Sequence, residues 1–361
     1  MRDRYFSRDF FTARERFKAA CLYAGGTPQT FVNPTGAPNG QEIGTEVVRF
    51  GPISASKLLV LMSGAHGAEA MVGSGCQAGW LVNGGPGDLP PDTSVLLIHG
   101  TNCWGAAAGR RNNEDNVDLC RNFIDYAQPL PENPGYEAIH DAINCPALDG
   151  PARDEANTAL QAYAQRNGAN ALMRAIMTGQ YSHPDGFGYG GQKPTWSAQT
   201  LLTVLAEHAA TARTVGIVDF HSGVGPYGYG MAASMDTGEA LAVARGWYGG
   251  WINAPVDEAL AGKGDYYTTH GHPTEGYRRL LKDKAVAPIV LEFGTYPFQH
   301  VMDCMMRDHW LWQHGDPASN EGKEITAALR EAFYPNNADW RRAVWERAQH
   351  VIDQALRGLN R

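Results

Sequence analysis

The chain has 361 residues, 43% of them hydrophobic and 19% charged, which predicts a soluble globular protein with ample apolar material for a core. A formal net charge of -8 argues against a nucleic-acid-binding surface. No apolar run approaches the roughly 20 residues of a membrane helix, and the charged N-terminus lacks the apolar region of a secretory signal. The six cysteines are scattered without a CxxC pair, so we expect reduced thiols and a cytoplasmic location.

The predicted elements alternate between strands and helices along the chain. Apolar runs with the length of buried strands are residues 46–50, 57–62, 94–98, 214–220 and 288–293. Helical spacing or composition is seen at residues 10–23, 70–82, 154–180 and 197–211, and from 303 to 361 with a break at Pro335. Ser197 is a plausible N-cap of its helix. This alternation is typical of an α/β protein.

His66 and Glu69 lie in the predicted turn between the strand at 57–62 and the helix at 70–82. Open α/β sheets bind ligands at the carboxyl ends of their strands. Three residues apart in such a turn, an imidazole and a carboxylate can hold one cation, and this is a donor set that zinc accepts. A histidine in a turn can also be a surface hydrogen-bonding group, so the metal hypothesis requires a further ligand.

His221 supplies that candidate, because it follows directly on the strand predicted at 214–220. Two histidines at equivalent strand ends favour metal ligation. Asp219 either supports His221 or is an ordinary carboxylate with its own partners. Glu292 lies near the end of the last apolar run, where an acid is costly to bury unless it is paired or has a function. We therefore interpret Glu292 as an active-site carboxylate.

Residues 109–123 are unusually polar, with three arginines, four asparagines and three acids. One interpretation is a solvated loop. The other is a pocket for an anionic substrate group, because arginine binds carboxylates through two parallel hydrogen bonds.

Four short motifs then follow one another in order between residues 64 and 294. They are His66-Gly-Ala-Glu69, Arg110-Arg111 with Asn116-Val-Asp-Leu-Cys-Arg121-Asn122-Phe, Asp219-Phe-His221-Ser, and Leu291-Glu292-Phe-Gly. With these motifs the chain resembles the M14-like zinc carboxypeptidase superfamily, and within it the DUF2817-type branch related to succinylglutamate desuccinylase and aspartoacylase. The resemblance implies a phosphorylase/hydrolase-like α/β fold, a three-layer αβα sandwich with a mixed central sheet. We expect one catalytic domain over residues 1–361, with the C-terminal helices from 303 as an appended packing element that could also make a homo-oligomer contact.

The resemblance also implies residue roles. One zinc ion would be held by His66, Glu69 and His221, and Glu292 would be the general base and general acid. Arg110 or Arg111 would polarise the scissile carbonyl, and the substrate-binding residues would be Arg121, Asn122 and Asn116. The chain departs from the family pattern at Cys120, which stands where the first Asn of an Asn-Arg-Asn motif is usual. Asn122 or another loop amide would have to replace that group in holding a free C-terminal carboxylate.

These residues predict a zinc-dependent, carboxypeptidase-like hydrolase that cleaves an amide bond in a small peptide bearing a carboxylate. Two alternatives stay open: an N-acyl amino acid deacylase of aspartoacylase type, and a non-catalytic anion-binding protein on the same fold. A tyrosine that closes on the substrate could be Tyr266, Tyr267 or Tyr277. A serine hydrolase is disfavoured, because no Gly-x-Ser-x-Gly turn follows a strand.

Overall fold

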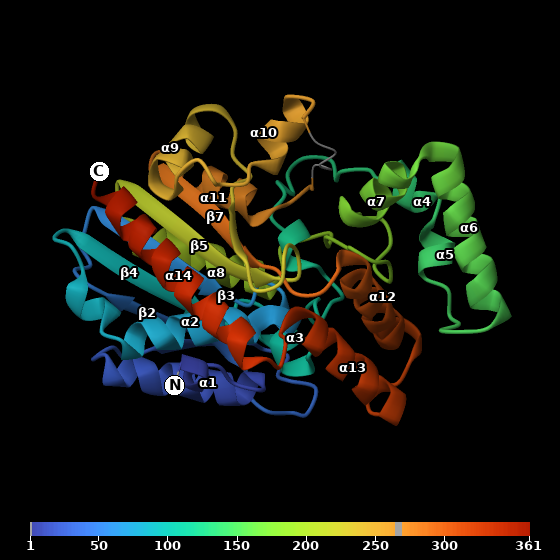
Figure 1. Ribbon diagram of the computed structural model, residues 1–361, viewed down its shortest axis with the longest axis horizontal. Coiled ribbons are helices and arrows are strands. Elements are labelled where there is room, and N and C mark those ends of the chain that lie inside the picture. The colour runs from blue at the N-terminus through green and yellow to red at the C-terminus, as the bar shows by residue number, and fades with distance from the viewer. Residues whose placement is uncertain (1, 264–268) are drawn as a thin grey trace.

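The computed structural model describes residues 2–263 and 269–361, and its centre is a sheet of seven strands (Figure 1). The strand order is β1-β2-β4-β3-β5-β7-β6. Neighbours β4, β3, β5 and β7 run parallel, whereas β1, β2 and β6 pair antiparallel. The strand bounds are β1 Gln29–Val32, β2 Gly44–Phe50, β3 Lys57–Ser63, β4 Thr93–His99, β5 Thr214–Ser222, β6 Gly230–Ala233 and β7 Ala285–Phe293. The predicted mixed sheet is therefore confirmed.

Helices cover both faces of this sheet. One face packs against α1 (Phe10–Tyr23), α2 (Ala70–Val82), α9 (Gly238–Tyr248) and α14 (Ala338–Leu359), and the other against α8 (Trp196–His208) and α11 (Pro273–Leu280). The packing of strand β3 on both faces explains why its sequence is continuously apolar. Leu59 and Leu61 belong to the core on the α1, α2 and α14 side, while Leu58, Val60 and Met62 belong to the core on the α8 side. Successive side chains point to opposite faces, and both faces are dry.

A group of four helices, α4 to α7, lies to one side of the sheet (Figure 1). It comprises α4 (Pro134–Glu137), α5 (His140–Ile143), α6 (Pro151–Asn167) and α7 (Ala169–Met177), and a third apolar cluster joins it to α12 (Phe298–His314) and α13 (Asn320–Phe333). The remaining helices are α3 (Cys103–Ala108) and α10 (Pro255–Leu260), with 3-10 turns η1 (Arg2–Tyr5), η2 (Gly67–Glu69), η3 (Gly85–Asp88) and η4 (Leu119–Arg121).

Most predicted elements are present, but the helix predicted at 154–180 is two helices, α6 and α7, separated at Gly168, whose φ is 96°. The helices predicted at 10–23 and 70–82 have the observed bounds, and Pro335 does separate α13 from α14. The N-cap prediction was wrong: Thr195, not Ser197, accepts the hydrogen bond from the N–H of Ala198. All six cysteines are free, as predicted, and all six are buried. Within residues 2–263 and 269–361, no helix combines the length and apolarity needed to span a bilayer.

Candidate metal centre

The candidate site lies where the order of the parallel strands reverses. From β3 the chain first adds β4 on one side and later adds β5 on the other side. The connections therefore lead to opposite sides of β3, and the carboxyl ends of the strands at such a reversal are the usual place for a ligand. His66 follows β3, and His221 is the penultimate residue of β5.

The turn after β3 holds His66 and Glu69 by close backbone packing. Gly64 has a φ of 81°, a left-handed conformation that favours glycine. A Cβ on Gly67 would lie 2.0 Å from the carbonyl carbon of Gly105 in α3. The N–H of Gly67 donates to the carbonyl of Arg111 at 3.1 Å. The turn is thus fixed against the polar segment at 109–123.

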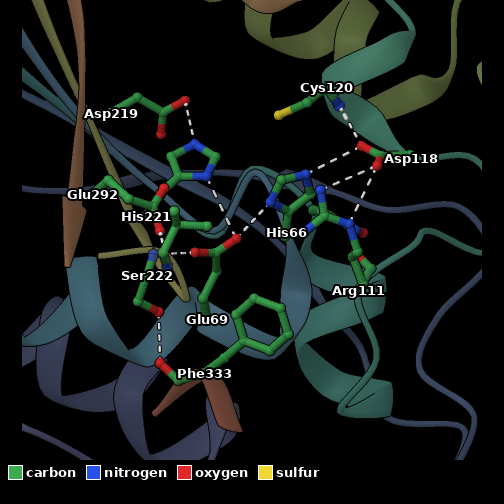
Figure 2. Close-up of polar contacts among 12 residues, drawn as sticks. His66, Glu69, Arg111, Asp118, Cys120, Asp219, His221, Ser222, Glu292 and Phe333 are labelled. Carbon is green, nitrogen blue, oxygen red and sulfur yellow. Dashed lines mark hydrogen bonds and ion pairs between the residues drawn. The ribbon is translucent and has the colours of Figure 1, made fainter. Parts of the chain in front are cut away.

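His66, Glu69 and His221 converge at this edge of the sheet (Figure 2). Glu69 Oε1 lies 2.5 Å from His66 Nδ1 and 3.4 Å from His221 Nδ1. The second oxygen, Oε2, accepts the backbone N–H of Ser222. One ligand atom from each of the three residues lies within 4.8 Å of the others, and none of the residues is more than 5% exposed. Two imidazoles and a carboxylate are a donor set that fits zinc and leaves a coordination position open.

Two aspartates hold the outer nitrogens of these imidazoles. His66 Nε2 lies 3.1 Å from Asp118 Oδ1, and His221 Nε2 lies 3.0 Å from Asp219 Oδ2 (Figure 2). Carboxylates in this position orient metal-binding histidines and raise their basicity. Asp219 is thus the partner of His221, the first of the two interpretations left open above. Asp118 was missed from the sequence, although its place in the second of the four motifs, three residues before Arg121, is a usable signal.

The pKa values reflect this dense arrangement of charge. Burial opposes ionisation of Glu69, but the neighbouring His221 and His66 outweigh burial and lower its pKa. Burial likewise opposes protonation of His221, yet Asp219 and Glu69 raise its pKa well above its ordinary value. Protons are therefore held between imidazoles and carboxylates at neutral pH. A divalent cation fits the same donors, because its charge replaces those protons.

Glu292 is placed beside His221 by the register of β5 and β7. Its Oε1 accepts the N–H of Val224 at 3.0 Å, and the residue is half-buried. Burial, and then the negative charge of Glu69, raise the pKa of Glu292 to about 7. A carboxyl group with this pKa can both accept and donate a proton near neutral pH.

The adjacent arginines point to different partners. Arg111 donates through Nε and Nη2 to Asp118 Oδ2, both at 3.2 Å, and so lies next to the His66 side of the centre (Figure 2). The guanidinium of Arg110 packs over the ring of Trp312, 4.9 Å from the centroid, and lies 3.9 Å from Asp308. Of the two, Arg111 is the one brought to the candidate metal centre.

Three further predicted site residues bond to backbone groups. Arg121 donates to the carbonyls of Cys120 at 2.9 Å and Met177 at 2.7 Å, while its buried Nε has no hydrogen-bond partner in the described part of the chain. Asn122 accepts the N–H of Thr195 and donates to the carbonyl of Gly190. Asn116 donates to the carbonyls of Pro184 and Gly186. Both asparagines therefore hold the loop between α7 and α8.

His272 is a neighbour of the centre that the sequence did not reveal. It caps the start of α11, and burial, followed by the charges of Arg121, His221 and His66, lowers its pKa to about 3. His272 also lines a cavity of about 400 Å³ together with Asp236 and Arg278. Of the tyrosines considered, Tyr277 is buried with its hydroxyl 3.5 Å from Met62 Sδ, and Tyr266 and Tyr267 lie outside the described residues.

Fold and site together define an α/β protein with a buried His–Glu–His cluster of metal-ligand type at the switch point of its sheet. The family model described as "Protein of unknown function (DUF2817)" matches residues 6–347. The chain belongs to this family, which confirms that part of the resemblance. A comparison with curated protein sequences found no match.

Solved structures give a more distant likeness. Bovine thrombin-activatable fibrinolysis inhibitor, in a complex with tick carboxypeptidase inhibitor, is 11% identical with a TM-score of 0.45, covering 96% of this chain and 98% of the other. Carboxypeptidase A from Helicoverpa armigera is 12% identical with a TM-score of 0.47, and the match covers 90% of this chain and 74% of the other. Succinylglutamate desuccinylase from Chromobacterium violaceum is 14% identical with a TM-score of 0.37, and the match covers 89% of this chain and 74% of the other.

Proposed function

We propose that this protein is a zinc-dependent hydrolase that cleaves an amide bond, with one zinc ion held by His66, Glu69 and His221. The observation that carries the proposal is the convergence of these three ligand atoms within 4.8 Å beside Glu292. Three protein ligands with an open position are typical of catalytic rather than structural zinc sites. When bound, zinc would supply a Lewis acid that lowers the pKa of water and polarises a carbonyl.

Glu292 is the proposed general base and general acid. Its raised pKa, about 7, lets it take a proton from the attacking water and pass that proton to the departing nitrogen. Glu292 would act at the open coordination position of the cluster, since Glu292 is the register partner of His221 in the sheet.

Arg111 is the proposed electrophilic group for the scissile carbonyl. Its guanidinium is held by Asp118 next to the His66 ligand, so a positive charge is in place before the oxyanion develops. We do not assign this role to Arg110, because that side chain is already packed between Trp312 and Asp308.

Arg121 is the proposed partner of a substrate carboxylate, because its Nε–H has no protein acceptor among the described residues. Asn116 and Asn122 would act on substrate binding indirectly, by holding the loop between α7 and α8. This arrangement accepts a small peptide or an N-acyl amino acid, since both carry a carboxylate next to an amide.

Replacement of Glu292 by Gln tests the chemistry. The amide keeps the shape of the side chain but cannot exchange protons, so hydrolysis should fall by about 10²–10⁴-fold. Zinc content, measured by atomic emission, should stay at the wild-type level. Glu207→Gln, an exposed position on α8, is the matched control and should leave turnover unchanged. Turnover by Glu292→Gln equal to that of the wild type would remove Glu292 from the mechanism.

The substrate class is tested by comparing peptides with a free C-terminus against N-acyl amino acids. Hydrolysis of either set that a chelator abolishes and zinc restores supports the proposal. Metal binding without hydrolysis of any amide substrate would instead favour the non-catalytic anion-binding alternative.

A further inference from the structure

A second group of metal-ligand side chains lies outside the candidate centre, between α5 and the loop that follows α7. His140 is the first residue of α5, and His183 and Asp185 belong to the loop. The two imidazole rings stack with centroids 3.7 Å apart and planes inclined by 16°. His140 Nε2 lies 3.9 Å from Asp185 Oδ1. One ligand atom from each residue lies within 4.8 Å of the other two.

Neighbouring groups hold this cluster in place. Glu137 Oε2 lies 2.8 Å from His183 Nε2, and the other Glu137 oxygen accepts the hydroxyl of Ser182. Asn144 Nδ2 donates to Asp185 Oδ2 at 2.7 Å. A carboxylate on one nitrogen of a histidine and an amide on a neighbouring carboxylate are the contacts that orient metal ligands in proteins.

His140 is the least satisfied member of the cluster. Its side chain is only 13% exposed, and its buried Nδ1 has no hydrogen-bond partner among the described residues. Burial, and then the nearby His183, lower the pKa of His140. The neutral imidazole is thereby favoured, and this is the form that binds a metal ion.

We propose that His140, His183 and Asp185 form a second binding site for a divalent transition-metal ion such as zinc, separate from the centre at His66. Zinc bonds of about 2.1 Å place tetrahedral ligand atoms about 3.4 Å apart, so the 3.9 Å separation of His140 and Asp185 needs to close by only about half an ångström. The side chain of Asp185 is 55% exposed, so little packing opposes this adjustment. The stacked rings would turn so that a nitrogen of each faces the ion.

An ion at this site would connect α5 to the loop, and the loop to the first centre. The residues on either side of Asp185, Pro184 and Gly186, accept hydrogen bonds from Asn116 through their carbonyls. Asn116 Oδ1 in turn accepts from Arg110 Nη2 at 2.8 Å. Binding of the ion should therefore stabilise the loop between α7 and α8 and, through Asn116, the segment around Arg110. This effect does not depend on whether the protein is a hydrolase.

The test is zinc stoichiometry by equilibrium dialysis of the full chain, followed by metal analysis. His183→Gln should bind one equivalent of zinc fewer than the wild type, and Asp185→Asn should bind that equivalent at least about 10-fold more weakly. His350→Gln, an exposed position on α14, is the control and should match the wild type. Melting temperatures of the metal-free proteins identify any variant that fails to fold. If His183→Gln fails to fold, zinc binding by Asp185→Asn, a change at an exposed side chain, decides whether the second site exists.

The two metal sites can be told apart in the same experiment. Glu69→Gln should lose the equivalent of the first centre and keep the one that His183→Gln removes. If the wild type bound a single equivalent that only His183→Gln removed, the first centre would be refuted and the second supported. Unchanged zinc binding in both His183→Gln and Asp185→Asn would overturn the second site.

Discussion

Asp118→Asn is the sharpest probe of the first centre, because it alters a ligand's support without touching a ligand. In the protein Asp118 Oδ1 lies 3.1 Å from His66 Nε2 and accepts the N–H of Cys120, while Oδ2 accepts twice from Arg111. The Oδ1 atom of an asparagine can keep the contacts with His66 Nε2 and with the N–H of Cys120. Its NH₂ group, however, would face the guanidinium, donor against donor, and the negative charge that supports the basicity of His66 would be lost.

The expected cost is a 10–100-fold weaker affinity for zinc, or about 1.4–2.8 kcal/mol, the range found when the outer partner of a metal-binding histidine is removed. The assay is a competition titration against a chromophoric zinc chelator. Asp92→Asn is the control, since Asp92 is an exposed turn residue directly before β4, at the opposite end of the sheet, with a φ of 55° that asparagine tolerates. Equal zinc affinity in Asp118→Asn and the wild type would refute the role given to Asp118.

Three other predictions concern stability, each measured by denaturant unfolding. Burial lowers the pKa of His99 to about 3, so below pH 6.5 the unfolded chain binds a proton that the folded chain does not, and stability falls on acidification. In His99→Gln the loss of stability between pH 6.5 and 5 should be smaller by about 1.6 kcal/mol. An identical loss in the variant and the wild type would contradict this. Gly67→Ala should cost about 1–3 kcal/mol through overpacking against Gly105, and a neutral effect would mean that the turn can move. Arg110→Met should cost about 3 kcal/mol by leaving Asp308 buried without its cation, whereas a loss of turnover alone would restore Arg110 to a catalytic role.

The sequence predicted the parts of the site that depend on strand ends. His66, His221 and Glu292 each stand at the carboxyl end of a parallel strand, and parallel strands bring those ends to one edge. The apolar runs that form β3, β4, β5 and β7 are long enough to be recognised alone. Strands β1 and β6 were missed because each has four residues and lies at an edge of the sheet, where little apolar patterning is required.

The remaining features depend on contacts between distant segments. Arg110 and Arg111 are neighbours in sequence, and only the packing of Trp312 against one and Asp118 against the other separates their roles. His272 lies at the start of α11, a helix that was not predicted from the sequence although Pro273 and Glu275 are typical of a helix start. The helix cap was misjudged for a simpler reason, since Thr195 and Ser197 both have a hydroxyl that suits the position.

The pairing of β3 with β5 has a consequence for the order of events during biosynthesis. A growing polypeptide that has emerged as far as α2 carries His66 and Glu69 but lacks His221, which follows only after β4 and helices α3 to α8. Any ion shared by the three side chains must await the insertion of β5 beside β3. Tight retention of such an ion would therefore report that the middle of the sheet is complete, and a truncated product ending before β5 would be left without it.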